Sequence, residues 1–384
     1  PEVSKEWEVG FTTGLFNNKA NLEFTYWDRV TEDALFARQF APSGGFRSTQ
    51  LVNLGTLEAH GIEVNVNATI VKKKDLNVEL FANGAYLREN VASLGGAPPL
   101  KVGGSYPRYR NFLIEGYAPG ANFGAALADV PAGSIPVDLN RDGQADTRQQ
   151  AIDFLSELTT ANASLPTVVG AGGILLRDDD GDGDLLDHYL GKSTPDWTGS
   201  FGGSVKWKNF SLKTMFEYRA GNYVVNNLTD AFRQANAVIG RNLPTSARTE
   251  RDYLTGGVDG SFNPQNSGDV RLEALEDWVY NTLALSPFSG LNTFEKADFI
   301  RWRELSVTYQ FPRSFVDKLG FETMSLTGAG RNIALFTGYS GVDPELQYVG
   351  RGGGSALDQN FGQGVAAFGW PIPRQILFTL KVGF

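Results

Sequence analysis

The sequence contains no cysteine, so disulfide bonds cannot support its fold. That absence suits a protein of the bacterial envelope, although cytosolic proteins can lack cysteine too. Long apolar runs are also missing, because the longest, residues 168–176, falls far short of the roughly 18 residues that a membrane-spanning helix needs. The chain is therefore either soluble or a β-barrel, in which the membrane signal is hidden because only every second residue of a strand faces lipid.

Positive charge and histidine are scarce as well. The formal net charge is -9 at pH 7, which argues against a nucleic-acid partner because phosphate binding needs clustered lysine and arginine. Only two histidines are present, His60 and His188, so a histidine-based proton relay is poorly supplied. The glycine run at residues 352–354 lacks the lysine and the helix of a phosphate loop. We find no catalytic set and predict that the protein is not an enzyme.

Period-two alternation is the dominant pattern, and it is clearest at the end of the chain, in residues 375–384. One face of the strand predicted there carries Ile376, Phe378, Leu380, Val382 and Phe384. The other face is mostly polar. A strand that ends on an aromatic residue resembles the terminal strand of bacterial outer-membrane barrels, and the alternative is the last strand of a soluble β-protein.

Further alternating segments are joined by short turns at one end and by long loops at the other. The predicted strands cover residues 6–16, 22–27, 62–70, 76–88, 201–207, 210–218, 299–311, 324–336 and 375–384. The long connections are a looser segment at 30–53 and the loops 89–196, 221–296 and 337–370, with short helices expected around 270–283. Outer-membrane barrels show this asymmetry between periplasmic turns and outer loops, whereas a soluble sandwich more often has turns of similar length at both ends.

The count of about nine strands sets the predicted fold class. We predict an all-β protein, a transmembrane antiparallel β-barrel with long extracellular loops. Bacterial single-chain barrels have even strand numbers, and two open edges would leave backbone groups unpaired in lipid. We therefore expect residues 1–384 to be the C-terminal portion of a larger barrel. Because residue 1 begins in the middle of a strand motif, we also expect the natural N-terminus to lie upstream.

Several short motifs follow one another along nearly the whole chain. They are NLG at 53–55, GIE at 61–63, IEGY at 114–117, an acidic GDG stretch that leads to YLG at 189–191, TPDWTGSF at 194–201, FIRWRELSVTY at 299–309, GRNIALFTGYSGVDPE at 330–345 and PIPR at 371–374. Each motif is weak alone, and the stretch at 330–345 is the most specific. In this order and spacing they resemble the C-terminal half of the SusC/RagA family of TonB-dependent outer-membrane transporters.

The resemblance implies a twenty-two-stranded barrel with an N-terminal plug threaded through it, of which this chain would be the last nine strands. It also implies active import of oligosaccharides or peptides across the bacterial outer membrane, driven by TonB acting on the plug. The family usually works with a SusD-like surface lipoprotein that lids the barrel, which we expect at loops such as 221–296 or 337–370. Neither the plug nor the TonB box has a counterpart in this sequence, so we expect that this piece cannot transport by itself.

Two acidic stretches have the spacing of calcium-binding loops. The candidate ligands are Asp138, Asn140, Asp142 and Asp146 in the first stretch and Asp178, Asp180, Asp182 and Asp187 in the second. Gly143 and Gly183 allow the sharp bend at position six, but Gln149 and Tyr189 stand where a bidentate glutamate is expected. Calcium binding and a pair of solvated acidic turns both stay open. The SusC-like family often has one such stretch before its YLG segment, which favours a structural role in an outer loop.

Two other functions stay open from the sequence. The chain could belong to a passive porin or another ligand-binding outer-membrane barrel, and a plug and TonB box upstream would decide against that reading. It could also be a secreted β-rich protein that binds glycans, and such a protein would need no detergent for extraction. Aromatic side chains in the loops would suit stacking on sugar rings, whereas most of those in the strands are expected to contact outer-membrane lipid.

Overall fold

The structure is a computed structural model. It describes residues 1–38, 40–45, 50–102, 109–138, 140–147, 149–150, 175–229, 294–346, 364–367 and 369–384. The helices expected around residues 270–283 lie outside these ranges, as do most residues of the loops 221–296 and 337–370. Among the described helices, none has both the length and the apolar character needed to cross a membrane.

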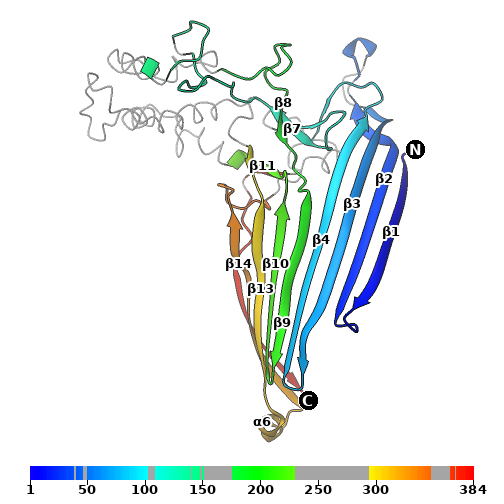
Figure 1. Ribbon diagram of the computed structural model, residues 1–384, viewed down its shortest axis with the longest axis vertical. Coiled ribbons are helices and arrows are strands. Elements are labelled where there is room, and N and C mark those ends of the chain that lie inside the picture. Colours follow the sequence, from blue (N-terminus) through cyan, green and yellow to red (C-terminus); the bar gives the residue numbers. More distant parts are fainter. Residues whose placement is uncertain are drawn as a thin grey trace, which may run out of the picture.

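Nine long strands form one antiparallel sheet (Figure 1). In sheet order they are β1 (Val3–Leu15), β2 (Ala20–Arg38), β3 (Gln50–Lys73), β4 (Leu76–Ser93), β9 (Trp197–Trp207), β10 (Phe210–Ala220), β13 (Phe299–Gln310), β14 (Thr323–Thr337) and β16 (Gln375–Gly383). Short connections lie at one end of the sheet, including α6 (Arg313–Val316) with the following 3-10 turn η3 (Asp317–Leu319). Strand β1 starts at the opposite, long-loop end and β16 finishes at the short-turn end (Figure 1). The predicted nine strands and their antiparallel arrangement are thereby confirmed.

The register sorts the side chains into an apolar and a polar face of this sheet. One row across five strands of the apolar face consists of Val9, Tyr26, Ile62, Tyr86 and Trp197. A row on the polar face consists of Thr12, Glu23, Asn65, Asn83, Ser200 and Glu217. On the apolar face Phe378 is 80% exposed and Ile376 is 76% exposed. An apolar surface of this extent indicates contact with lipid or with another protein.

Of the described residues between 30 and 53, a stretch predicted as a looser segment, most are in strands. Strand β2 continues to Arg38, which pairs with Gln50 at the start of β3. Two register shifts on either side of Ala34, with Asp33 at a positive φ of 54°, break the period of two that would reveal the strand in the sequence. Ala34 and Phe36 are buried in a small core at the long-loop end of the sheet. The prediction was wrong here because bulges hide a strand from its alternation pattern.

Residues 89–196, predicted as a loop or cap without alternation, contain further β-structure. Strand β4 extends to Ser93. A separate four-stranded sheet follows, built from β5 (Leu100–Lys101), β6 (Asn111–Leu113), β7 (Ala121–Gly124) and β8 (His188–Gly191). These strands are short, and all four residues of β7 are buried, so no alternation marks them in the sequence. Figure 1 places β7 and β8 at the long-loop end, as a cap would lie.

A bulge in β13 changes which side chains reach the polar face. Trp302 pairs with Phe216 and Glu304 pairs with Met215, so Arg303 is an extra residue with no counterpart on β10. Without this extra residue, consecutive side chains of β13 would alternate between the two faces of the sheet. The bulge leaves Arg303 and Glu304 on the same face of the sheet, next to Glu217 and Met215 of β10.

Two arginines of this bulged strand hold the segment that follows β14. Arg301 forms ion pairs with Asp343 and Glu345, and Arg303 forms ion pairs with Glu217 and Glu345. The hydroxyl of Tyr223 donates a hydrogen bond to the carbonyl oxygen of Pro344 (2.8 Å). A small sheet of β12 (Phe294–Lys296), β11 (Val224–Asn227) and β15 (Val365–Ala366) lies beside them. Charged and apolar contacts thus join three stretches of chain at the long-loop end.

Candidate ligand-binding cleft

Strands β4 and β9 separate at the long-loop end of the sheet. Their last residue pair is Tyr86 with Trp197, and the N–H of Leu87 then donates to the carbonyl oxygen of Asp196 (2.9 Å). Four residues further along β4, the N–H of Val91 donates to the carbonyl oxygen of Tyr117 (2.8 Å). Alternate residues of a strand point their N–H groups the same way, so the N–H of Glu89 faces the gap between these two bonds. It has no hydrogen-bond partner within the described ranges.

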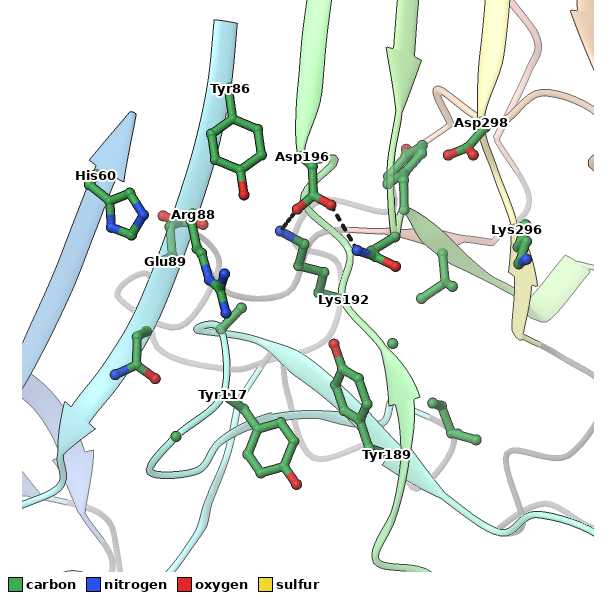
Figure 2. Close-up of a pocket in the computed structure, with 18 of the residues that line it drawn as sticks. His60, Tyr86, Arg88, Glu89, Tyr117, Tyr189, Lys192, Asp196, Lys296 and Asp298 are labelled. Carbon is green, nitrogen blue, oxygen red and sulfur yellow. Dashed lines mark hydrogen bonds and ion pairs between the residues drawn. The ribbon is translucent and has the colours of Figure 1, made fainter. Parts of the chain in front are cut away.

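A cleft of about 990 Å³ opens at this gap (Figure 2). Its walls come from β3 and β4, from the small sheet of β5–β8, and from the segments around β11 and β12. Binding sites for small molecules are typically clefts of roughly 300–1,000 Å³. The volume therefore suits a ligand of several rings or a short peptide.

Tyr117 and Tyr189 form the aromatic side of the cleft, across from Tyr86 (Figure 2). Their ring centroids are 5.0 Å apart at an interplanar angle of 41°, and each residue is 38% exposed. Phe123 packs edge-on against Tyr117, with 5.0 Å between centroids. Partial burial raises the pKa of the Tyr189 hydroxyl. The pair offers exposed ring faces together with hydroxyl groups.

The small sheet fixes these rings through a buried arginine. The Nε of Arg110 donates to the carbonyl oxygen of Phe123 (2.6 Å), and one of its terminal nitrogens donates to the carbonyl oxygen of Leu186 (2.8 Å). Its guanidinium also lies over the ring of Phe112, 5.2 Å from the centroid. Arg110 thereby ties β7 to the segment that precedes β8, and with it Phe123 and Tyr189.

Charged groups of both signs line the rest of the cleft. Lys192 and Asp196 form an ion pair with little exposure of either side chain, and Asn222 donates a second hydrogen bond to Asp196 (2.8 Å). His60 and Arg88 approach from β3 and β4 (Figure 2). Neither has a polar partner in the part of the chain that the structure describes. The cleft can therefore donate and accept hydrogen bonds without presenting a strong net charge.

The second acidic stretch is the one in which three predicted ligands come together. The carboxylate oxygens of Asp178, Asp180 and Asp182 lie within 4.8 Å of one another. Asp187 does not belong to this group, and burial together with neighbouring carboxylates, Asp180 first among them, raises the pKa of Asp187. Gly183 has a φ of 86° and donates its N–H to Asp178 (3.2 Å), which closes the bend that the spacing predicts.

The first acidic stretch bends in the same way but does not gather its carboxylates. Gly143 has a φ of 85° and donates its N–H to Asp138 (2.9 Å). Asn140 and Asp142 are exposed, whereas Asp138 and Asp146 are buried at 7% and 2% exposure. Among the residues that the structure describes, Asp138, Asp142 and Asp146 do not form a group of three close carboxylates.

The sequence did not identify the residues of the cleft as a site. Tyr117 ends the IEGY motif and Tyr189 begins the YLG motif, and the structure brings these two motifs together. Asp196 lies in the TPDWTGSF motif and faces them across the cleft. The motifs were the available signal, because short distinctive stretches far apart in a sequence point to a shared location in the fold.

Comparisons with known proteins agree with this architecture. No family model matches the chain. The TonB-dependent receptor P3 of Formosa agariphila is 26% identical over 362 residues, which cover 90% of this chain and 31% of the relative. The TonB-dependent receptor SusC of Bacteroides thetaiotaomicron is 24% identical over 177 residues, 41% of this chain and 18% of the relative. The chain thus spans at most about a third of the length of these curated relatives.

Two solved structures of a RagAB peptide transporter have the same fold over this region. One superposes with a TM-score of 0.63 at 20% sequence identity, covering 100% of this chain and 35% of the other. Another, in an open-open state, gives a TM-score of 0.64 and covers 99% of this chain. At this identity the likeness establishes the fold. Sequence and fold together show that the chain resembles about a third of a TonB-dependent receptor of the SusC/RagA type.

Proposed function

We propose that residues 1–384 supply nine strands to the wall of a barrel that imports oligosaccharides or peptides by TonB-dependent transport. One observation carries this proposal: a nine-stranded antiparallel sheet has an apolar face, a polar face, short turns at one end and long segments at the other. In this arrangement the apolar face contacts lipid and the polar face lines the lumen. The remaining strands and a plug come from the rest of the protein.

The proposed partner is a SusD-like surface lipoprotein that closes the barrel from outside. The long connections are all at one end of the sheet, so a lid would meet them together (Figure 1). The name RagAB, given to the peptide transporter of similar fold, supports a two-component arrangement. Ligand is captured under the lid, and TonB then acts on the plug to admit it.

Uptake by cells tests the proposal directly. We expect cells that carry the receptor to take up labelled oligosaccharides or peptides, and we expect collapse of the proton-motive force to stop this uptake. A passive porin would continue to equilibrate the solute after the collapse. Detergent extraction supplies the second measurement. We expect the receptor and its lipoprotein to co-purify from detergent-treated outer membranes, whereas a secreted protein would appear without detergent.

We also propose that the second acidic stretch binds Ca²⁺. The closeness of Asp178, Asp180 and Asp182 supports this, since Ca²⁺ prefers several hard oxygen ligands. The ion would stabilise the turn that leads into β8, and so the position of Tyr189. The same proposal for Asp138, Asn140, Asp142 and Asp146 has weaker support, because their carboxylates are not gathered.

A further inference from the structure

The apolar face of the sheet changes in character at its border with the short turns. The last row of this face, read across the strands, consists of Lys73, Leu76, Trp207, Phe210, Tyr309 and Leu326. The row before it consists of Val71, Val78, Val205, Leu212 and Val307. Aliphatic side chains thus give way at this border to aromatic rings and a lysine.

Aromatic rings follow one another along the border as far as α6. The distance between ring centroids is 6.5 Å from Trp207 to Phe210, 4.8 Å from Phe210 to Tyr309, 5.0 Å from Tyr309 to Phe311 and 5.5 Å from Phe311 to Phe315. Trp207 and Phe315, at the two ends of this series, are both exposed. Aromatic girdles of membrane barrels lie at the level of the lipid headgroups. The series of rings therefore marks the depth at which acyl chains end and headgroups begin.

Three lysines lie at the Trp207 end of this series. Lys73 ends β3, Lys74 follows it in the turn, and Lys208 lies in the turn after β9. The two turns are in contact, because the N–H of Lys208 donates to the carbonyl oxygen of Asp75 (2.9 Å), and the Nζ of Lys208 lies 5.5 Å from the ring centroid of Trp207. All three lysines are exposed, and none forms an ion pair with a residue that the structure describes. Asp75 is the one carboxylate of the two turns, so positive charge is in excess there.

The long-loop border of the same face does not share this excess in strands β1–β4. Lys5 forms an ion pair with Glu32 there (2.7 Å). One row of the register consists of Trp7, Asp28, His60 and Arg88, which gives one carboxylate for one guanidinium. Both borders thus carry aromatic side chains, whereas the unpaired lysines gather at the short-turn border.

Building on the proposed barrel wall, whose short-turn end faces the periplasm, we propose that this border binds an anionic phospholipid. Lys73, Lys74 and Lys208 hold its phosphate, beside the ring of Trp207. Its acyl chains lie along the aliphatic rows further from the turns. The structure thus offers an apolar surface for the chains and an excess of positive charge for the headgroup, side by side on one face.

The charge excess selects among phospholipids by their headgroups. A phosphatidylethanolamine headgroup carries an ammonium group beside its phosphate, so attraction to the lysines and repulsion from them partly cancel. A phosphatidylglycerol headgroup carries the phosphate charge alone. Each lysine close to a membrane surface favours anionic lipid by about fivefold in affinity. The three lysines should therefore favour phosphatidylglycerol.

Titration with single phospholipids tests this proposal. The full receptor, with any lipoprotein partner, is purified in an uncharged detergent, and native mass spectrometry counts the phospholipid molecules that it retains. Phosphatidylglycerol and phosphatidylethanolamine with identical acyl chains are compared. The test variant combines Lys73→Gln, Lys74→Gln and Lys208→Gln.

The matched control removes three lysines from the polar face near the same end of the sheet. It combines Lys72→Gln, Lys206→Gln and Lys213→Gln, and the register places all three on that face. A third variant has arginine in place of the three lysines of the border. It keeps the charge, which separates a lost charge from a disturbed fold.

We expect the natural receptor to retain phosphatidylglycerol in preference to phosphatidylethanolamine. In the test variant the concentration of phosphatidylglycerol for half-occupancy should rise by about fivefold for each lysine replaced. The polar-face control and the arginine variant should keep the preference. Equal retention of the two lipids by the natural receptor, or an equal loss in the polar-face control, would overturn the proposal. Displacement of phosphatidylglycerol by hexaglutamate would also overturn it, in favour of an acidic protein segment.

The uptake assay separates this result from the proposed function. Energy-dependent uptake by a receptor with no preference for phosphatidylglycerol rejects the lipid site and leaves import standing. A preference that depends on the three lysines, in a protein whose uptake ignores the proton-motive force, supports the lipid site and rejects TonB-driven import.

Discussion

The guanidinium of Arg301 and the carboxylate of Asp343 form an ion pair with almost no exposure to solvent, at 4% and 2% for the two side chains. The two residues are 42 positions apart in sequence. Asp343 also accepts a hydrogen bond from the N–H of Glu345 (3.0 Å), so the segment that carries both carboxylates is folded around the guanidinium of Arg301. This contact fixes the chain that leaves β14 against the end of β13.

Replacing Asp343 by alanine should destabilise this end of the sheet by about 1.5–3 kcal/mol, because Arg301 would lose one charged hydrogen-bond partner while keeping Glu345. Chemical denaturation of the detergent-solubilised receptor measures the loss. Asp317→Ala is the control, since Asp317 pairs with Arg313 on the surface and should cost about 0–1 kcal/mol. Equal losses of stability in the two variants would show that the buried ion pair stabilises the fold no more than the surface pair does.

Tyr223 should make stability depend on alkaline pH. Burial raises the pKa of its hydroxyl from 10.0 to about 12. The folded state therefore keeps its proton where the unfolded state loses it, so the full contribution is present below pH 10 and is lost as the pH rises towards 12. The loss amounts to about 2–3 kcal/mol. Stability measured across this range should fall in the natural protein and fall less in Tyr223→Phe.

Near pH 12 the larger loss should leave the natural protein less stable than Tyr223→Phe, whereas near neutral pH the natural protein should be the more stable of the two. Tyr223→Phe removes the hydrogen bond to Pro344 and should be less stable by about 1 kcal/mol. If both proteins showed the same slope between pH 10 and 12, another group would have to account for the alkaline loss.

A charge on the apolar face of the last strand should impair assembly. Phe378 is 80% exposed there, over Gly328 of β14. Phe378→Asp should cost at most about 2–4 kcal/mol if this face meets lipid, carboxylates being milder than basic groups. Thr379→Asp is the matched control, because Thr379 pairs with Thr327 on the polar face. The fraction of heat-modifiable, folded protein in outer membranes gives the comparison, and normal assembly of Phe378→Asp would refute the lipid contact.

Calcium should stabilise the receptor through the second acidic stretch. At a concentration one hundred times the dissociation constant, the ion would add about 2.7 kcal/mol. Replacing both Asp178 and Asp180 by asparagine should remove the heat of Ca²⁺ binding and the rise in melting temperature. Asp129→Asn alters an exposed carboxylate nearby, next to Arg177, and should change neither. Binding that survives the double substitution would place the ion elsewhere.

The sequence predicted the fold well because alternation reports directly on which face of a strand is covered. It predicted all nine strands, and it failed where the period of two is interrupted. The bulges around Ala34 concealed the continuation of β2, and the buried strand β7 has no polar face to alternate. Both failures come from tertiary contacts that leave no periodic trace.

The cleft was beyond sequence reasoning for a different reason. Tyr117 and Tyr189 are 5.0 Å apart in space, yet each looks like an ordinary loop aromatic in the sequence. The acidic stretches were visible because their ligands are close along the chain. Spacing nevertheless did not reveal that the carboxylates gather in only one of the two stretches, since burial of Asp138 and Asp146 depends on surrounding residues.

The extra residue in β13 has a consequence for the loss of single residues. Removing Arg303 would give β13 and β10 equal spacing between Trp302 and Glu304, so every other side chain of the strand would keep its face. Removing Leu305 instead would shift the alternation by one residue from that point to the end of the strand. Each side chain there would then point to the opposite face of the sheet, so those that face the lumen would face lipid and the reverse. Loss of Arg303 would therefore restore the spacing against β10, but it would widen the irregularity against β14, where Asn332 and Ile333 already lie opposite this one residue. It would also remove the ion pairs that Arg303 makes with Glu217 and Glu345.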